Sequence, residues 1–168
     1  MALKSPLMAM SLLVATIPAS AADPDVLAGR YGHDVSEPAY QPVWEVIHEG
    51  GRWQARNVGD DDYSVAYRMS GVGRRAFWEK MGWPLASADT ADCVSWGDAP
   101  ASLVDMLEEA IPVTGADTYG LALVCHVPPA TRAQIDWLRA SAEDWFYYDP
   151  MAGVMEVRRL PRDAPTAP

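Results

Sequence analysis

A cysteine precedes a histidine at the point where an apolar run gives way to a helical pattern, in the segment Leu123-Val124-Cys125-His126-Val127. A thiolate beside an imidazole could serve as a nucleophile with its general base. The base must come within hydrogen-bond reach of the sulfur, yet consecutive residues of a strand point to opposite faces. We therefore do not expect His126 to activate Cys125, and we interpret this cysteine as structural.

The chain contains two cysteines, Cys93 and Cys125, which allow one intramolecular disulfide. Each cysteine lies in a strand-like run that is followed by a Pro-Ala-Ser or Pro-Ala-Thr step into a helical pattern. This similarity places the two residues at equivalent ends of two strands. In the chain-entropy description a bridge over a loop of this length stabilises the fold by about 3–4 kcal/mol. The sequence predicts a Cys93–Cys125 disulfide.

Other catalytic and ligand-binding patterns are missing from the sequence. It has neither the G-x-S-x-G nor the S-x-x-K motif of serine nucleophiles, and its glycines match no phosphate-binding loop. The histidines His33, His48 and His126 show no H-x-x-x-H spacing, and the cysteines show no C-x-x-C spacing. We predict no catalytic set, metal site or cofactor from local sequence. An active site would require these histidines to converge with Asp or Glu in three dimensions.

The first 22 residues have the features of a secretory signal peptide. Lys4 precedes an apolar run at 7–17, and Ala19-Ser20-Ala21 matches an A-x-A cleavage site. We expect cleavage near Ala21 or Ala22. The apolar run is about half of the roughly 20 residues that a membrane-spanning helix needs, so the mature chain is expected to have no integral membrane segment. Export delivers the cysteines to an oxidising compartment, and we predict a periplasmic or secreted protein.

The chain is acidic, with 23 Asp and Glu against 13 Lys and Arg and a formal net charge of −10. A protein with this charge repels nucleic acid, because binding phosphates requires Lys and Arg. It would attract a basic protein partner, although the same charge could serve solubility alone. The acidic turn Asp60-Asp61-Asp62 lacks the glycine and the distal Glu of a calcium loop, so we interpret it as a solvated turn.

Hydrophobic patterning predicts a single α+β domain over 23–160, mainly an antiparallel sheet, followed by a flexible tail at 161–168. Two turn signals, at 49–52 and 59–62, separate three alternating runs and predict an N-terminal three-strand meander. The expected meander strands are 43–48, 53–58 and 63–69; the later strands are 90–96, 119–127, 145–148 and 153–160; the three helices are 72–83, 99–111 and 129–142.

Four aromatic residues precede an aspartate in the segment Trp145-Phe146-Tyr147-Tyr148-Asp149. On a strand, Trp145 and Tyr147 would share one face, and Phe146 and Tyr148 the other. One pair is then expected in the core, and the other is a candidate surface for binding a basic partner. The alternative is that both faces of this strand pack in a core.

Export, acidity, a single disulfide and the lack of a catalytic pattern together predict a binding or inhibitory protein of the periplasm. An immunity or inhibitor protein against a basic cell-wall-degrading enzyme would have these properties. The alternative is a small exported hydrolase whose active site combines a histidine with carboxylates from distant parts of the chain.

Overall fold

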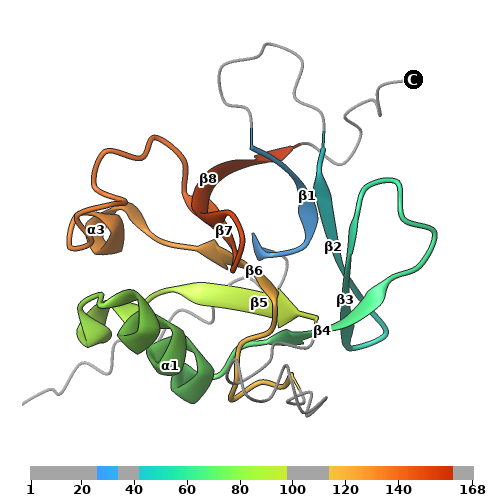
Figure 1. The fold of residues 1–168 in the computed structure, drawn as a ribbon, viewed down its shortest axis with the longest axis horizontal. Helices are drawn as coiled ribbons and strands as arrows, with labels where there is room; N and C mark the ends of the chain where they lie inside the picture. The colour runs from blue at the N-terminus through green and yellow to red at the C-terminus, as the bar shows by residue number, and fades with distance from the viewer. Residues whose placement is uncertain (1–25, 34–41, 98–113, 161–168) are drawn as a thin grey trace, which may run out of the picture.

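The computed structural model describes residues 26–33, 42–97 and 114–160, which form a closed antiparallel barrel of eight strands (Figure 1). Each strand pairs with the next along the chain, and β1 also pairs with β8. The strands are β1 (Gly29–Gly32), β2 (Trp44–Glu49), β3 (Arg52–Asn57), β4 (Ser64–Arg68), β5 (Asp92–Trp96), β6 (Ala122–His126), β7 (Trp145–Asp149) and β8 (Gly153–Leu160). In the described parts of the connections there are three helical segments, namely α1 (Gly71–Met81), η2 (Leu85–Asp89) and α3 (Pro129–Arg132).

The predicted α+β fold with three helices is wrong. Within the described residues α1 is the one helix longer than two turns, and the sheet closes on itself. Closure depends on β1, a four-residue strand in a segment for which we predicted neither a strand nor a helix. Its partner β8 lies at the other end of the domain, so local periodicity could not reveal the pairing. The helix predicted at 99–111, the signal peptide at 1–22 and the tail at 161–168 lie outside the described residues.

The helix predicted at 129–142 stops after one turn, at Arg132. The chain then continues through turns in which Ile135 N–H donates to the Arg132 carbonyl and Leu138 N–H to the Ile135 carbonyl. Arg132 also donates through Nη1 to the carbonyls of Ser141 and Glu143. This arginine therefore ties the end of the segment back to its start, which a continuous helix would not permit.

The three-strand meander is confirmed as β2, β3 and β4. Gly50 and Gly51 both have positive φ, 57° and 75°, as the two central residues of a type I′ hairpin turn require. The helix expected at 72–83 is confirmed as α1. Ser70 accepts the N–H groups of Val72 and Gly73 at its start, and Gly82 ends it in the left-handed conformation.

Two hydrophobic cores lie on opposite faces of β5, β6 and β7. The barrel core contains Val94, Val124 and Tyr147 from these strands, whereas the outer core contains their neighbours, among them Leu123 and Phe146. In the barrel core, Trp44 stacks on Tyr147 with ring centroids 3.8 Å apart. The outer core lies between the barrel wall and the layer formed by α1, η2 and the 127–144 connection (Figure 1).

The predicted disulfide is confirmed. Cys93 and Cys125 lie directly opposite each other on β5 and β6 with their Cα atoms 4.1 Å apart. Both side chains are fully buried in the outer core. The bridge thus joins two adjacent strands beneath the helical layer, where it has a structural role.

Gly120 lies where the β5–β6 connection returns to the barrel. A Cβ atom at this position would collide with the backbone carbonyl oxygens of Trp96 and Gly97. Backbone atoms cannot move aside as the end of a flexible side chain can, so this close approach requires glycine.

We predict that Gly120→Ala lowers the free energy of unfolding by about 1–3 kcal/mol, the usual cost of overpacking. Urea denaturation followed by tryptophan fluorescence measures this change. Gly115→Ala is the matched control in the same connection, because its Cβ would meet only Thr118 Oγ1 at 3.9 Å. Equal stability of the two variants would contradict the prediction.

Candidate functional site

The three histidines lie beside three different tryptophans. His33 is 6.0 Å from Trp44, His48 stacks on Trp53 at 4.3 Å, and His126 is 5.1 Å from Trp145, measured between ring centroids. His33 follows β1 at one end of the barrel, whereas His48 and His126 lie near the other end, on β2 and β6. Within the described residues, no histidine shares a hydrogen bond or an ion pair with a carboxylate.

His126 is partly buried, at the end of β6 and on the strand face that points into the barrel. It lies opposite Asp92 on one neighbouring strand and opposite Trp145 on the other. Burial lowers the pKa of His126, although the charges of Asp144 and Asp92 act in the opposite direction. The Asp92 carboxylate is held by Arg68 through Nε (2.9 Å) and Nη2 (2.5 Å). The sulfur of the neighbouring Cys125 is in the disulfide on the other face of β6, so it is not available to this histidine.

The aromatic segment of β7 is placed mostly in the two cores. Phe146 and Tyr148 belong to the outer core and Tyr147 to the barrel core, while Trp145 is half-buried. Burial, together with the charge of Asp149, raises the pKa of Tyr147 to about 12. This arrangement corresponds to the alternative in which both faces of the strand are packed, so these rings do not provide an open binding surface.

Sequence reasoning missed a difference in charge between the two ends of the barrel. In the up-and-down order of strands, β1, β3, β5 and β7 end at one rim, and β2, β4 and β6 end at the other. The described parts of the connections that follow the first group are 33, 42–43, 58–63, 97, 114–121 and 150–152; they contain Asp60, Asp61, Asp62 and Asp117 and no Lys or Arg. Of these, Asp117 accepts a hydrogen bond from Ser70 at the start of α1. Those that follow the second group are 50–51, 69–91 and 127–144, with five acidic and five basic residues.

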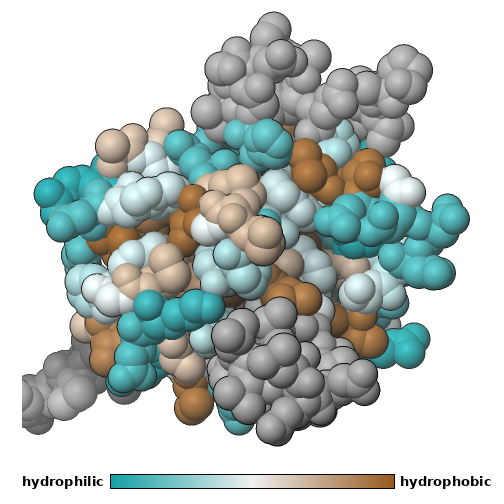
Figure 2. Space-filling view, in the orientation of Figure 1, coloured by the Kyte–Doolittle hydropathy of each residue, from teal (hydrophilic) through white to brown (hydrophobic). Residues whose placement is uncertain are grey.

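We name the first end the acidic rim. Of the residues that the structure describes at this end, we consider the β3–β4 turn at 57–63 and the β7–β8 turn at 149–153. Asp60, Asp61 and Asp62 are all exposed in the β3–β4 turn. Asn57 donates to Asp60 Oδ2 at 2.9 Å, and in the described part of the chain the carboxylates of Asp61 and Asp62 have no hydrogen-bond partner. Figure 2 shows the hydrophilic surface over this turn at the right of the view.

Arg56 reaches the β3–β4 turn, where it shares the Glu45 carboxylate with Arg30. It donates to Glu45 through Nε (3.0 Å) and Nη2 (2.8 Å), and its Nη1 donates to the Asp60 carbonyl. Arg30 and Tyr63 donate to the same carboxylate. Burial alone would raise the pKa of Glu45, yet the hydrogen bonds from Arg56, Tyr63 and Arg30 lower it overall. Two arginines and one glutamate thus leave a net positive charge beside the three exposed aspartates, which it offsets in part.

At the opposite end of the barrel most of the acidic residues are in ion pairs. The ion pairs among its connections are Arg75–Asp89, Arg132–Asp144 and Arg139–Asp136. In each pair the positive and negative charges compensate each other, so the pairs add little net charge to that rim. Among the described connections, the longest run of exposed carboxylates is Asp60-Asp61-Asp62 in the β3–β4 turn.

The lowered pKa of His126 predicts a loss of stability in acid. An unfolded histidine binds a proton near pH 6.5, and the folded state resists this protonation, so the free energy of unfolding falls as the pH drops below about 6.5 through the folded pKa. Substitution His126→Gln should reduce this slope in urea titrations at about pH 7.5 and about pH 5.5. His33→Gln, at an exposed position, controls for removal of a histidine. A slope unchanged in His126→Gln would contradict this account.

The described residues contain no helix long and apolar enough to cross a membrane. They also contain no group of three or more His, Cys, Asp or Glu side chains that could hold a metal ion. Comparison of the chain with protein-family models, curated proteins and solved structures finds no match. The acidic rim is thus the feature from which a function can be argued.

Proposed function

We propose that this protein is an exported binding protein that holds a basic protein partner at the acidic rim and has no chemistry of its own. The observation behind this proposal is the run of exposed aspartates Asp60-Asp61-Asp62 in the β3–β4 turn, two of which have no hydrogen-bond partner among the described residues.

Electrostatics at the acidic rim favours a cationic partner. Asp60, Asp61 and Asp62 are consecutive and exposed, so they lie within the screening distance of about 8 Å at physiological ionic strength. Their mutual repulsion is relieved when a basic surface approaches. Charges arranged in this way also steer a partner of opposite sign and raise its association rate.

The filling of the barrel supports recognition at its surface over transport of a cargo inside. An eight-stranded barrel is just wide enough for side chains to fill its interior. Here Trp44, Trp96 and Tyr147 are each at most 6% exposed and lie in the barrel core together. Binding at a rim leaves this core undisturbed.

The expected location supports the class of partner. The disulfide is consistent with folding in an oxidising compartment, and residues 1–22 match a signal peptide. We propose the periplasm or the cell exterior, where basic cell-wall-degrading enzymes are present, and we propose an immunity or inhibitor role against one of them. The alternative of a small hydrolase has weaker support, because each histidine has a separate environment.

A charge-neutral rim should bind basic proteins less well. We predict that the triple variant Asp60→Asn, Asp61→Asn, Asp62→Asn binds lysozyme, a basic cell-wall-degrading enzyme, about 3-fold to 100-fold more weakly than the unchanged protein. This range assumes that each exposed charge pair contributes about 0.2–1 kcal/mol. Calorimetry at low salt measures the dissociation constants, and a cell-wall lysis assay reports inhibition. Cytochrome c, equally basic but without this activity, tests selectivity.

The control is a triple variant at the other end of the barrel: Glu79→Gln, Asp89→Asn and Asp136→Asn change the net charge by the same amount. It should bind lysozyme nearly as well as the unchanged protein. Equal weakening in both triple variants would show that net charge alone matters, and no binding of lysozyme at low salt would reject this partner class.

A further inference from the structure

A pocket of about 240 Å³ lies in the barrel wall between residues 28–30 and 45–49. It is present because the β1–β2 ladder ends at the pair Gly29–Val46, whereas β2 continues to Glu49. Before Gly29 the chain turns into the barrel, where Leu27 is fully buried in the barrel core and its carbonyl accepts a hydrogen bond from the Tyr31 hydroxyl at 2.7 Å. The last three residues of β2 therefore pair with β3 on one side and border this pocket on the other.

His48 presents its backbone to the pocket side of β2. Glu49 and Arg52 flank the two-residue turn between β2 and β3, so they form the hydrogen-bonded pair that closes the hairpin. Successive residues of a strand send their N–H and C=O groups to opposite sides, so those of Ile47 point to β3 and those of His48 point away from it. The described residues provide no backbone partner for His48 on that side. An unpaired donor and acceptor at a sheet edge form a template for an added strand.

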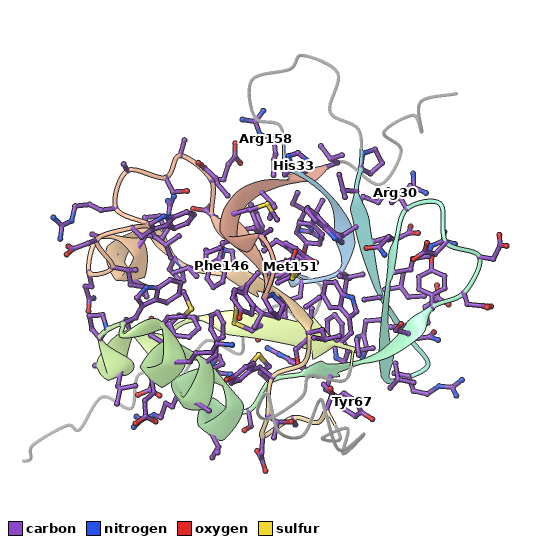
Figure 3. The ribbon with its side chains drawn as sticks, viewed as in Figure 1. Arg30, His33, Tyr67, Phe146, Met151 and Arg158 are labelled. Atoms are coloured by element: carbon purple, nitrogen blue, oxygen red, sulfur yellow. A yellow bond between two sulfur atoms is a disulfide. The ribbon has the colours of Figure 1, made fainter. Side chains whose placement is uncertain are left out.

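The two ends of the pocket carry opposite charges. Arg30 donates to Glu45 through Nε alone, at 3.1 Å, and its two Nη nitrogens have no partner in the described ranges. Glu45 also accepts hydrogen bonds from Arg56 and Tyr63, so the Arg30 end of the pocket keeps a positive charge. Figure 3 shows Arg30 on the outside of the wall, beside β2. Glu49 is exposed at the other end, and its carboxylate is unpaired among the residues that the structure describes.

The spacing of these charges and the size of the pocket limit the ligand. Arg30 lies opposite Glu45, four residues before Glu49 on β2, and four residues of a strand span about 13 Å. Three residues of an extended peptide span about 10 Å, and the long side chains of Arg30 and Glu49 cover the difference. The volume lies just below the roughly 300–1,000 Å³ of pockets for drug-sized ligands, which suits a ligand of a few small residues.

We propose that this pocket binds a short peptide with free ends, of about three small residues, as an extended strand antiparallel to β2. A strand in the place that β1 leaves open has the same direction as β1, so its first residue lies beside Glu49 and its last toward Arg30. The direction of the strand thus matches the order of the charges, with the ammonium group at Glu49 and the carboxylate at Arg30. Backbone hydrogen bonds to His48 supply affinity in this mode of recognition, and the Arg30 guanidinium suits a carboxylate.

The first test varies the ligand and leaves the protein unchanged. Tri-alanine with free ends, titrated into the ¹⁵N-labelled full chain, should bind and shift the NMR signal of the His48 amide. An amide at its C-terminus or an acetyl group at its N-terminus should each weaken binding by about 3-fold to 30-fold, because each removes one charge-assisted contact. Methylation of the central peptide nitrogen should weaken binding by a similar factor, since it removes the bond to the His48 carbonyl.

Single alanine is the control for length, because it carries both charges but cannot extend from Arg30 to Glu49. It should bind about 10-fold more weakly than tri-alanine. No binding of tri-alanine, or equal binding of tri-alanine, its blocked forms and alanine, would overturn the proposal.

The second test varies the protein. Arg30→Gln should abolish the preference for a free carboxylate and keep the preference for a free amine, whereas Glu49→Gln should do the reverse. General damage to the fold would not give this crossed pattern. Arg139→Gln is the matched control: it removes the same charge at an exposed site in the 127–144 connection and should keep both preferences. An Arg30→Gln variant that still prefers the free acid to the amide as strongly as the unchanged chain would overturn the proposal.

The peptide site is separate from the acidic rim, so the two proposals fail independently. The triple variant of Asp60, Asp61 and Asp62 leaves residues 28–30 and 45–49 unchanged, and it should bind tri-alanine as well as the unchanged chain does. Loss of tri-alanine binding in this variant would place the peptide at the acidic rim and overturn the assignment to the pocket.

Discussion

The pairing of β1 with β8 is the constraint on which the rest of the structure depends, because it closes the barrel and fixes which connections share an end. Arg159 helps to secure this pairing: its Nε and Nη2 donate to the Ala28 carbonyl at 3.0 and 2.6 Å, across 131 positions of sequence. Gly29 leaves the space for that arginine, since a Cβ there would lie 2.8 Å from Arg159 Nε. Closure brings connections that are separate in the sequence to the same end of the barrel, so the charged residues of these connections lie near one another.

Closure also explains why the helices gather on one side. The strands β5, β6 and β7 are buried on both faces, and every residue of β5 is buried. Their outward side chains, including the disulfide, require a cover, which α1, η2 and the 127–144 connection provide. By contrast, Val65 and Tyr67 on the outer face of β4 are exposed. The wall opposite the helices is thus left to solvent and to ion pairs such as Arg56–Glu45.

Much of the local structure could be predicted from the sequence, because the signals for it are local. Gly50 and Gly51 predict the β2–β3 hairpin, apolar periodicity predicts the helix α1, and the two cysteines predict the bridge. The closed barrel could not be predicted, because β1 is short and its second partner is distant in sequence. The acidic rim had a signal in Asp60-Asp61-Asp62, yet the elements around this turn could be known only once the closure of the barrel was known.

The central claim, that the acidic rim is where a basic partner binds, is tested most directly by hydrogen–deuterium exchange of the protein with and without a bound basic partner. The account predicts slower exchange in 57–64 and 149–153 on binding, with little change in 71–91 and 129–144. Protection confined to the helical side of the barrel, or spread evenly over the surface, would contradict it.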